Sequence, residues 1–229
     1  FVIDGVGVIN PIASMPGQSQ YSLDKLPALV ERYYQLGITA VILFGVPDEK
    51  DECGASAASA DGLIAKAIGV IKQATPAMLV IADVCLCEYT SHGHCGVIDE
   101  KGQINNDLTL PWLGRQAVAF AEAGADIVAP SGMMDGMVNA IRSALDAANF
   151  HDTFILSYAV KYQSAFYGPF RDAAGGAPQF GDRATHQMNP ANKKEALIEA
   201  QLDIEEGADM LMVKPALPYL DILADLALS

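Results

Sequence analysis

The sequence predicts an α/β protein built as a (β/α)8 TIM barrel, in which about six of the eight βα units are present. Stretches with helical periodicity alternate with short apolar runs, and this alternation repeats about five times along the 229 residues. Such apolar runs are typical of strands buried on both faces of a parallel sheet. No Gly-rich phosphate-binding motif opens a predicted helix, which disfavours an open dinucleotide-binding sheet.

A recurring junction predicts where the strands begin. A predicted helix ends at a glycine and an apolar run follows at Gly37, Gly124 and Gly207. Glycine just past a helix end supplies the left-handed residue of a C-cap. With two further apolar runs and a remnant at the start of the chain, the predicted strands lie before residue 4, near residues 41, 128 and 211, and at residues 78–84 and 154–159.

Six strands do not close a barrel that needs eight. We therefore expect a partial domain, in which the strand after Gly5 and the strand ending at Lys214 are not hydrogen-bonded to each other. Unpaired strand edges invite aggregation, so we expect the segment alone to be poorly soluble or inactive. The first residue, Phe1, is not a methionine, which also indicates a fragment.

Three apolar stripes at helical spacing predict helices that pack on the sheet. They comprise Leu63, Ala67, Ile68 and Ile71; Leu113, Ala117, Phe120 and Ala121; and Ile141, Leu145 and Ala148. Residues 163–190 break the pattern as a long irregular stretch rich in Gly, Pro and aromatic residues. We predict that this stretch is an active-site lid within a single barrel domain, residues 1–229.

Composition excludes some partners. The formal net charge of −14 disfavours nucleic acid, because phosphate binding needs clustered Lys and Arg. No apolar run approaches the roughly 20 residues of a membrane helix, so no membrane partner is expected. The N-terminus shows no signal-peptide pattern, and three of the four cysteines are clustered, which indicates metal or redox chemistry in the cytoplasm.

The clustered cysteines are Cys85, Cys87 and Cys95. In an extended chain Asp83, Cys85 and Cys87 share a face, and the glycine-containing loop that follows can return Cys95 to them. Three thiolates without a fourth protein ligand are typical of a catalytic zinc site with an open position, and soft sulfur ligands select zinc. Two alternatives remain. One is a structural zinc site with four ligands, in which a histidine is the fourth. The other is that the cysteines are ordinary buried residues and bind no metal.

Two lysines follow predicted strands, Lys161 and Lys214. Barrel enzymes place their chemistry at the C-terminal ends of strands. Burial and a second nearby cation both lower the pKa of a lysine, and a neutral amine can form a Schiff base with a ketone. The alternative is a surface lysine whose stem lies along the protein.

Other polar residues belong to the same predicted rim or to the predicted lid. Ser131 closes a strand at the rim, while Asp135 follows at a helix start, where simple capping is the alternative. Arg171 and Arg183 lie in the predicted lid, and guanidinium groups suit bidentate capture of a substrate carboxylate. Solvent-exposed loop charge is the alternative for both arginines.

These motifs resemble the zinc-dependent porphobilinogen synthase (5-aminolevulinate dehydratase) family nearly end to end. DVCLCEYTSHGHCG at residues 83–96 resembles the family's metal-binding signature, and DMLMVKPA at residues 209–216 resembles the segment of its Schiff-base lysine. SYAVKYQSAFYGPFR at residues 157–171 resembles the segment with the second lysine and a lid arginine. GDR at 181–183, QMNP at 187–190 and APSGMMDG at 129–136 also match.

The resemblance implies a hydro-lyase of tetrapyrrole (heme) biosynthesis that condenses two molecules of 5-aminolevulinate into porphobilinogen with loss of two waters. Lys214 would form the Schiff base with the substrate that supplies the propionate arm, and Lys161 with the one that supplies the acetate arm. The implied roles of the other residues are zinc binding by Cys85, Cys87 and Cys95, proton handling or orientation by Asp83, lining of the pocket by Ser131, and binding of the second substrate's carboxylate by Arg171, Arg183 and Gln187.

The resemblance further implies a homo-octamer, although the family's N-terminal arm and last two strands have no counterpart here. Glu199 matches the position at which some members bind an allosteric Mg²⁺. A class I Schiff-base aldolase on a similar barrel is the competing enzyme, and a non-catalytic zinc-binding barrel fragment is the non-enzymatic alternative. The aldolase needs one lysine and no metal, so the clustered cysteines argue against it.

Overall fold

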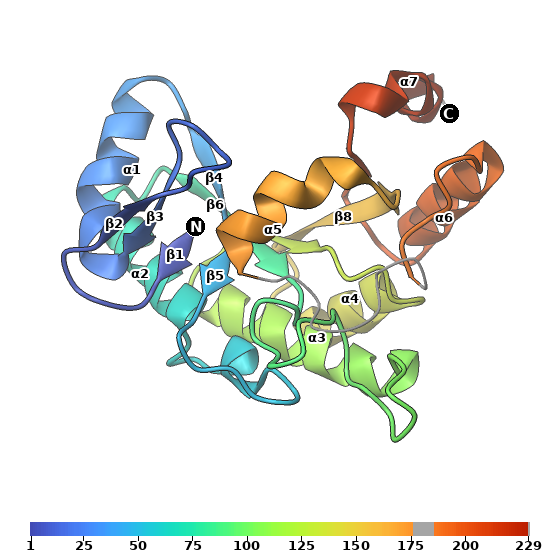
Figure 1. The fold of residues 1–229 in the computed structure, drawn as a ribbon, viewed down its shortest axis with the longest axis horizontal. Coiled ribbons are helices and arrows are strands. Elements are labelled where there is room, and N and C mark those ends of the chain that lie inside the picture. The colour runs from blue at the N-terminus through green and yellow to red at the C-terminus, as the bar shows by residue number, and fades with distance from the viewer. Residues whose placement is uncertain (176–185, 229) are drawn as a thin grey trace.

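A computed structural model describes residues 1–175 and 186–228 of the chain. Its main sheet has five parallel strands in the order β4-β6-β7-β8-β9, and it curves as a barrel wall does (Figure 1). The strands are β4 Ala40–Leu43, β6 Leu79–Val84, β7 Ile127–Pro130, β8 Phe154–Lys161 and β9 Met210–Lys214. The predicted α/β barrel architecture is confirmed.

A second, smaller sheet lies at the N-terminal end of the molecule. It contains β1 Val2–Ile3, β2 Ile9–Pro11, β3 Ser19–Ser22 and β5 Gly45–Val46, in the order β2-β3-β1-β5. Since β5 follows β4 almost directly along the chain, β1 stands beside the β4–β5 segment as a first barrel strand would. The predicted strand remnant is confirmed as β1. The strand after Gly5 is β2, and it belongs to a different sheet from β9, as expected.

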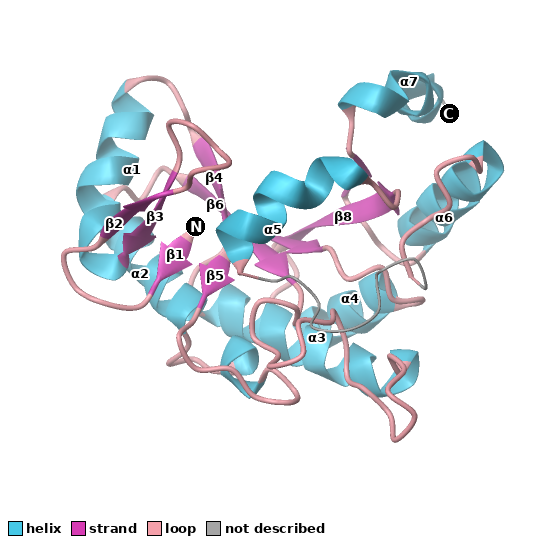
Figure 2. Ribbon diagram, viewed as in Figure 1, coloured by secondary structure: helices cyan, strands magenta, loops and turns pink. Residues whose placement is uncertain are grey.

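Seven α-helices are present in the described part of the chain, and α1 to α4 lie on the outside of the curved sheet (Figure 2). They are α1 Leu26–Gln35, α2 Leu63–Ala74, α3 Asn106–Glu122, α4 Met137–Ala147, α5 Gly168–Ala174, α6 Lys193–Glu205 and α7 Leu220–Leu228. Short 3₁₀ turns occur at Leu23–Lys25, Ala55–Ala58, Ala165–Tyr167 and Leu217–Tyr219.

The glycine junctions behave as predicted. Gly37, Gly124 and Gly207 follow the ends of α1, α3 and α6 with φ of 85°, 100° and 104°. Only glycine adopts this region without strain, so each helix can end there and the strand after it can begin.

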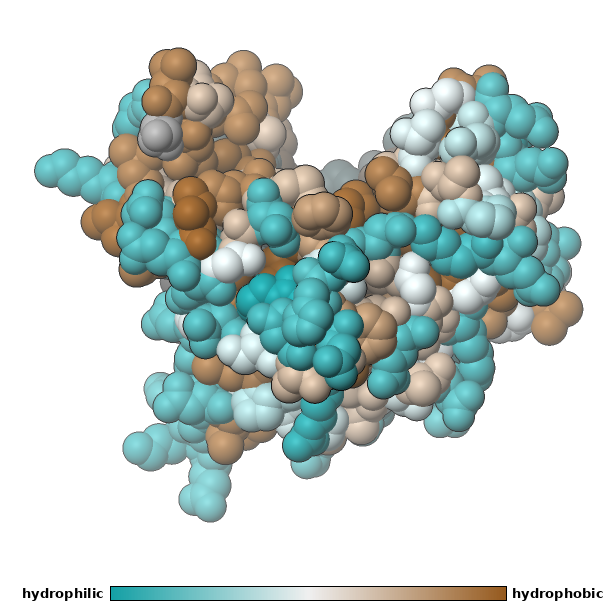
Figure 3. Space-filling model, turned by 180° about the vertical axis from the view of Figure 1, so that it is seen from behind, coloured by the Kyte–Doolittle hydropathy of each residue, from teal (hydrophilic) through white to brown (hydrophobic). Residues whose placement is uncertain are grey.

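The three predicted apolar stripes form the inner faces of α2, α3 and α4, which share one core with the sheet. The third stripe is one residue too long, because Ala148 lies beyond the last residue of α4 and is only half-buried. A smaller core joins β8 and β9 to α6 and α7. Apolar side chains also gather on the outside of this end of the molecule (Figure 3), with Leu217, Leu220 and Leu228 all exposed.

The interpretation of residues 163–190 as irregular throughout is wrong for residues 165–174. The 3₁₀ turn Ala165–Tyr167 leads directly into α5. Pro169 occupies the first turn of α5, where its fixed φ suits a helix and its missing N–H costs nothing, and Gly175 ends the helix at φ 57°. Within the described residues, no helix is both long and apolar enough to cross a membrane.

Candidate active site

The three clustered cysteines come together in a buried position. Their sulfur atoms all lie within 4.8 Å of one another, and the Sγ atoms of Cys85 and Cys87 are 3.3 Å apart. Three thiolates around one zinc ion, with Zn–S bonds of about 2.3 Å, would be about 3.8 Å apart. The predicted convergence of the three thiols is therefore observed, with separations of the size that a zinc site requires.

The route to this convergence differs from the expected alternation along a strand. Strand β6 ends at Val84, and Cys87 already lies in a turn in which the Leu86 carbonyl accepts hydrogen bonds from the Tyr89 and Thr90 amides. The turn, rather than strand pleating, brings Cys87 back towards Cys85. The residues 85–97, called the cysteine loop below, carry all three thiols.

No histidine completes the thiol cluster within the described residues, where the group able to hold an ion consists of the three cysteines alone. His92 Nε2 lies 3.0 Å from the Glu52 carbonyl, and His92 Nδ1 accepts a hydrogen bond from the His94 amide. The arrangement fits a three-thiolate site with an open position better than a four-ligand structural site.

Charge is divided unequally among the thiols. Hydrogen bonds from the Cys87 and Cys95 thiols lower the pKa of Cys85 well below its ordinary value, despite burial. The same hydrogen bonds, together with burial, raise the pKa of Cys87, whose Sγ also donates to Glu88 Oε2 at 3.1 Å. Because thiolates are the metal-binding form, a metal ion bound here would displace the remaining thiol protons.

The two candidate lysines are paired across neighbouring strands. In the β8–β9 ladder Leu156 is opposite Met210, yet Lys161 is opposite Lys214, because β8 contains one extra residue between Ser157 and Val160. Without this β-bulge, alternation would put Val160 rather than Lys161 on the face of Lys214. The bulge therefore places both amines on one face at the ends of the two strands.

Aromatic rings surround the Lys214 amine. Its Nζ lies 4.6, 4.7 and 5.7 Å from the ring centres of Phe170, Tyr158 and Tyr167. Lys161 Nζ is 5.3 Å from the same Tyr158 ring and donates a 2.6 Å hydrogen bond to the Ser131 carbonyl. Burial, followed by the charge of Lys161, lowers the pKa of Lys214 from 10.5 to about 8.

Asp83 lies close enough to both lysines and to Cys85 for their charges to affect its pKa. Its Oδ2 accepts a 3.1 Å hydrogen bond from Ser131 Oγ, whereas its buried Oδ1 has no hydrogen-bond partner among the described residues. Burial raises the pKa of Asp83 well above its ordinary value, and Glu88 and Cys85 raise it further, while Lys161 and Lys214 act in the opposite direction. A carboxyl in these surroundings holds its proton more strongly than an ordinary aspartate does.

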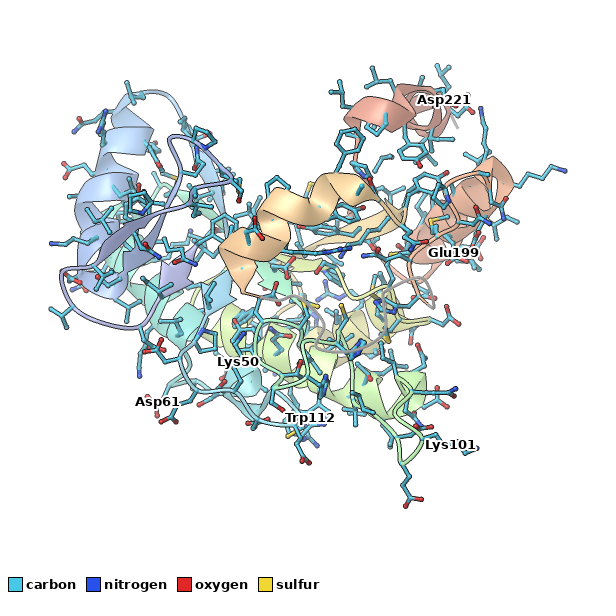
Figure 4. The ribbon with its side chains drawn as sticks, viewed as in Figure 1. Lys50, Asp61, Lys101, Trp112, Glu199 and Asp221 are labelled. Atoms are coloured by element: carbon cyan, nitrogen blue, oxygen red, sulfur yellow. The ribbon has the colours of Figure 1, made fainter. Side chains whose placement is uncertain are left out.

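The expected lid residues are only partly described. Arg171 lies on α5 and Gln187 is buried; among the described residues, neither the buried Nε of Arg171 nor Oε1 of Gln187 has a hydrogen-bond partner. Arg183 lies outside the described residues. Gln187 and Glu199 line one cavity of about 890 Å³ beside α6, where Figure 4 labels Glu199. This cavity meets the cysteine loop at His94 but is not lined by the two lysines.

Comparisons with known proteins agree on one family. The family model for delta-aminolevulinic acid dehydratase matches residues 1–228. The dehydratase of Halalkalibacterium halodurans is 58% identical over 225 residues, covering 98% of this chain and 68% of the relative, and that of Bacillus subtilis is 56% identical, covering 98% and 69%. The chain belongs to the delta-aminolevulinic acid dehydratase family.

A solved member of the family shows the same fold. The delta-aminolevulinic acid dehydratase (porphobilinogen synthase) of Toxoplasma gondii ME49, solved with the reaction product porphobilinogen, superposes with a TM-score of 0.96 at 50% identity. The match covers 99% of this chain and 65% of that one, so the chain spans about two thirds of the length of its relatives.

Four residues that contact the candidate site residues were not predicted from the sequence. Glu88 lies within the cysteine motif, where its position next to Cys87 was the available signal. Tyr158, Tyr167 and Phe170 contact Lys214, but an aromatic residue in a strand or an apparent loop reads as core packing. Their role depends on the β8 bulge and on α5, and neither was predicted.

Proposed function

We propose that this chain carries the catalytic centre of a porphobilinogen synthase, a hydro-lyase that joins two molecules of 5-aminolevulinate and releases two waters. The observation that carries the proposal is the pair of lysines on adjacent strand ends, together with the buried Asp83, whose pKa responds to both lysines and to Cys85, and the three convergent thiols. A reaction that needs two ketone-binding amines beside a metal suits this arrangement, and membership of the family supports it.

Each lysine would act as a nucleophile. The neutral amine adds to the substrate ketone, the carbonyl oxygen leaves as water, and a C=N bond replaces the C=O bond. A pKa of about 8 leaves a useful neutral fraction of Lys214 at physiological pH. By family resemblance Lys214 takes the substrate that supplies the propionate arm and Lys161 the one that supplies the acetate arm.

Asp83 is suited to proton transfer between these centres. Its buried carboxyl is protonated more readily than an ordinary aspartate, and Ser131 orients it through Oδ2 while Oδ1 remains available. Within a site of low polarity, such a group can deliver a proton to a departing oxygen and take one from carbon.

Cys85, Cys87 and Cys95 would hold zinc, since three soft ligands with an open fourth position fit this ion. When bound, zinc would supply Lewis-acid polarisation beside the second substrate. Arg171, Arg183 and Gln187 would bind that substrate's carboxylate. An allosteric Mg²⁺ at Glu199, a homo-octameric assembly and a cytoplasmic location are also part of this proposal.

Zinc content and porphobilinogen formation test the proposal, measured on this chain and on a form extended at both ends to the length of its relatives. We expect the extended form to bind zinc and to make porphobilinogen. Product formation should be lost on chelation and in Cys95→Ser but retained in the control Cys53→Ser, whose thiol lies outside the cluster. A Schiff base on one lysine, with no bound zinc and no porphobilinogen formed, would favour the aldolase alternative. Bound zinc without Schiff-base formation would indicate a non-catalytic metal-binding barrel.

A further inference from the structure

Both ends of the cysteine loop are attached to one face of α3. Gln116 contacts the loop where it begins, and Thr109 contacts it where it ends. The two residues are seven positions apart, which is two turns of an α-helix, so they project from the same side. Helix α3 lies against the sheet on the outside of the barrel wall (Figure 2).

At the first end, Gln116 Nε2 donates a 3.1 Å hydrogen bond to the Cys85 carbonyl. Gln116 is completely buried in the α3 core face, among apolar neighbours such as Leu113 and Ala117. Its Oε1 has no hydrogen-bond partner among the described residues. Burying an amide in such a place is costly unless it makes a useful hydrogen bond, and the bond to Cys85 is the one that this side chain makes.

At the other end, the equally buried Thr109 Oγ1 accepts a 3.0 Å hydrogen bond from the Val97 amide and donates one of 2.6 Å to the Asn105 carbonyl. The loop approaches so closely that a Cβ on Gly96 would lie 2.5 Å from this oxygen. Cys95 directly precedes Gly96, so the last thiol is held next to a tightly packed anchor point.

We propose that Gln116 and Thr109 are positioning residues that clamp the two ends of the cysteine loop to α3 and hold the three thiols in the metal-binding arrangement before metal arrives. This inference rests on the proposed metal site. A loop fixed in advance loses less conformational freedom when it binds an ion, so the clamp would raise metal affinity without supplying a ligand.

Substitutions in the full chain separate this role from general packing. Thr109→Val keeps the shape and removes the hydroxyl, Thr109→Ser keeps the hydroxyl, and Gln116→Met removes the amide at similar length. Thr75→Val is the matched control, because Thr75 Oγ1 is also buried but makes no hydrogen bond among the described residues. Zn²⁺ affinity is measured by competition with a chromophoric chelator, and thiolate geometry by the absorption spectrum of the Co²⁺ form.

We expect Thr109→Val and Gln116→Met to bind Zn²⁺ roughly 10- to 100-fold more weakly and to show altered Co²⁺–thiolate absorption. Thr109→Ser and Thr75→Val should resemble the parent. A parent chain that binds Zn²⁺, with unchanged affinity in both disruptive variants, overturns the clamp alone. A parent chain that binds no Zn²⁺ overturns the metal site and the clamp with it. If Gln116→Met does not fold, the Val and Ser variants of Thr109 still decide the question.

Discussion

Removal of the Lys161 charge should raise the pKa of Lys214, because repulsion between the two ammonium groups is one of the causes of its low value. The nitrogens lie 5.3 and 4.7 Å from the centre of the same Tyr158 ring, so they are at most about 10 Å apart. At an effective dielectric constant of about 20, two charges at that distance repel by about 1.7 kcal/mol, which corresponds to a pKa change of about 1.2.

In Lys161→Met we therefore expect the pKa of Lys214 to rise from about 8 by one or more. At pH 7 an amine of pKa 8 is about one-tenth neutral, and a rise of one lowers that fraction about tenfold. The rate at which 5-aminolevulinate becomes trapped on Lys214 by borohydride should fall correspondingly at pH 7, and its pH profile should move to higher pH.

The assay is the pH dependence of trapping, read at Lys214 by peptide mass spectrometry. Lys66→Met is the control, since Lys66 is exposed on α2 and its removal should leave the profile unchanged. If the pH profile of trapping in Lys161→Met is unchanged, or moves to lower pH, then charge repulsion from Lys161 does not lower the pKa of Lys214, and the reasoning is refuted.

Three further predictions concern stability. Lys214→Met should raise the free energy of unfolding at pH 7, by up to about 3 kcal/mol, because keeping a buried lysine charged is costly when its pKa falls from 10.5 to about 8. The gain should shrink as the pH rises from about 8 to 10.5, where Lys214 loses its charge in the folded protein before it does in the unfolded chain. Asp203→Asn should stabilise the fold by about 1–2 kcal/mol at pH 7 and not at pH 4, since burial raises the pKa of Asp203 to about 6 and the bond from Ser157 can be kept. Ile141→Ala should cost about 2–5 kcal/mol, because Ile141 is fully buried between α4 and the sheet.

Chemical denaturation at several pH values measures all three. Leu202→Ala is the control for Ile141→Ala, because Leu202 is 44% exposed on α6 and its truncation should cost little. A destabilised Lys214→Met at pH 7, or an Asp203→Asn variant whose gain does not vary between pH 4 and pH 7, would contradict the assigned causes of these pKa values.

The sequence predicted those features that depend on a few neighbouring residues, namely the helix ends, the strands that follow them and the candidate thiols and lysines. The three glycine junctions predicted both the helix ends and the strands that follow, because positive φ after a helix has few other solutions. The three thiols and both lysines could be proposed because thiols clustered in one loop suit a metal ion and lysines at strand ends suit Schiff-base chemistry, although the sequence left other roles open for both.

Features that depend on pairing were not predicted. Strands β2 and β3 are short and largely polar, and Pro11 in β2 is unusual for a strand, so their runs resemble a loop. The bulge in β8 exists only relative to β9, and α5 is short enough for its Gly and Pro to suggest irregular structure. The aromatic surroundings of Lys214 follow from both features, which is why the sequence indicated the amine but not the rings around it.

The central claim, that Lys161 and Lys214 form one two-amine site, is tested most directly by mapping borohydride-reduced adducts of 5-aminolevulinate by peptide mass spectrometry. Our account predicts adducts on Lys161 and on Lys214, with the other lysines unmodified, and loss of each adduct in the corresponding methionine variant. Adducts that form on neither lysine, or that spread evenly over exposed lysines such as Lys66, would contradict it.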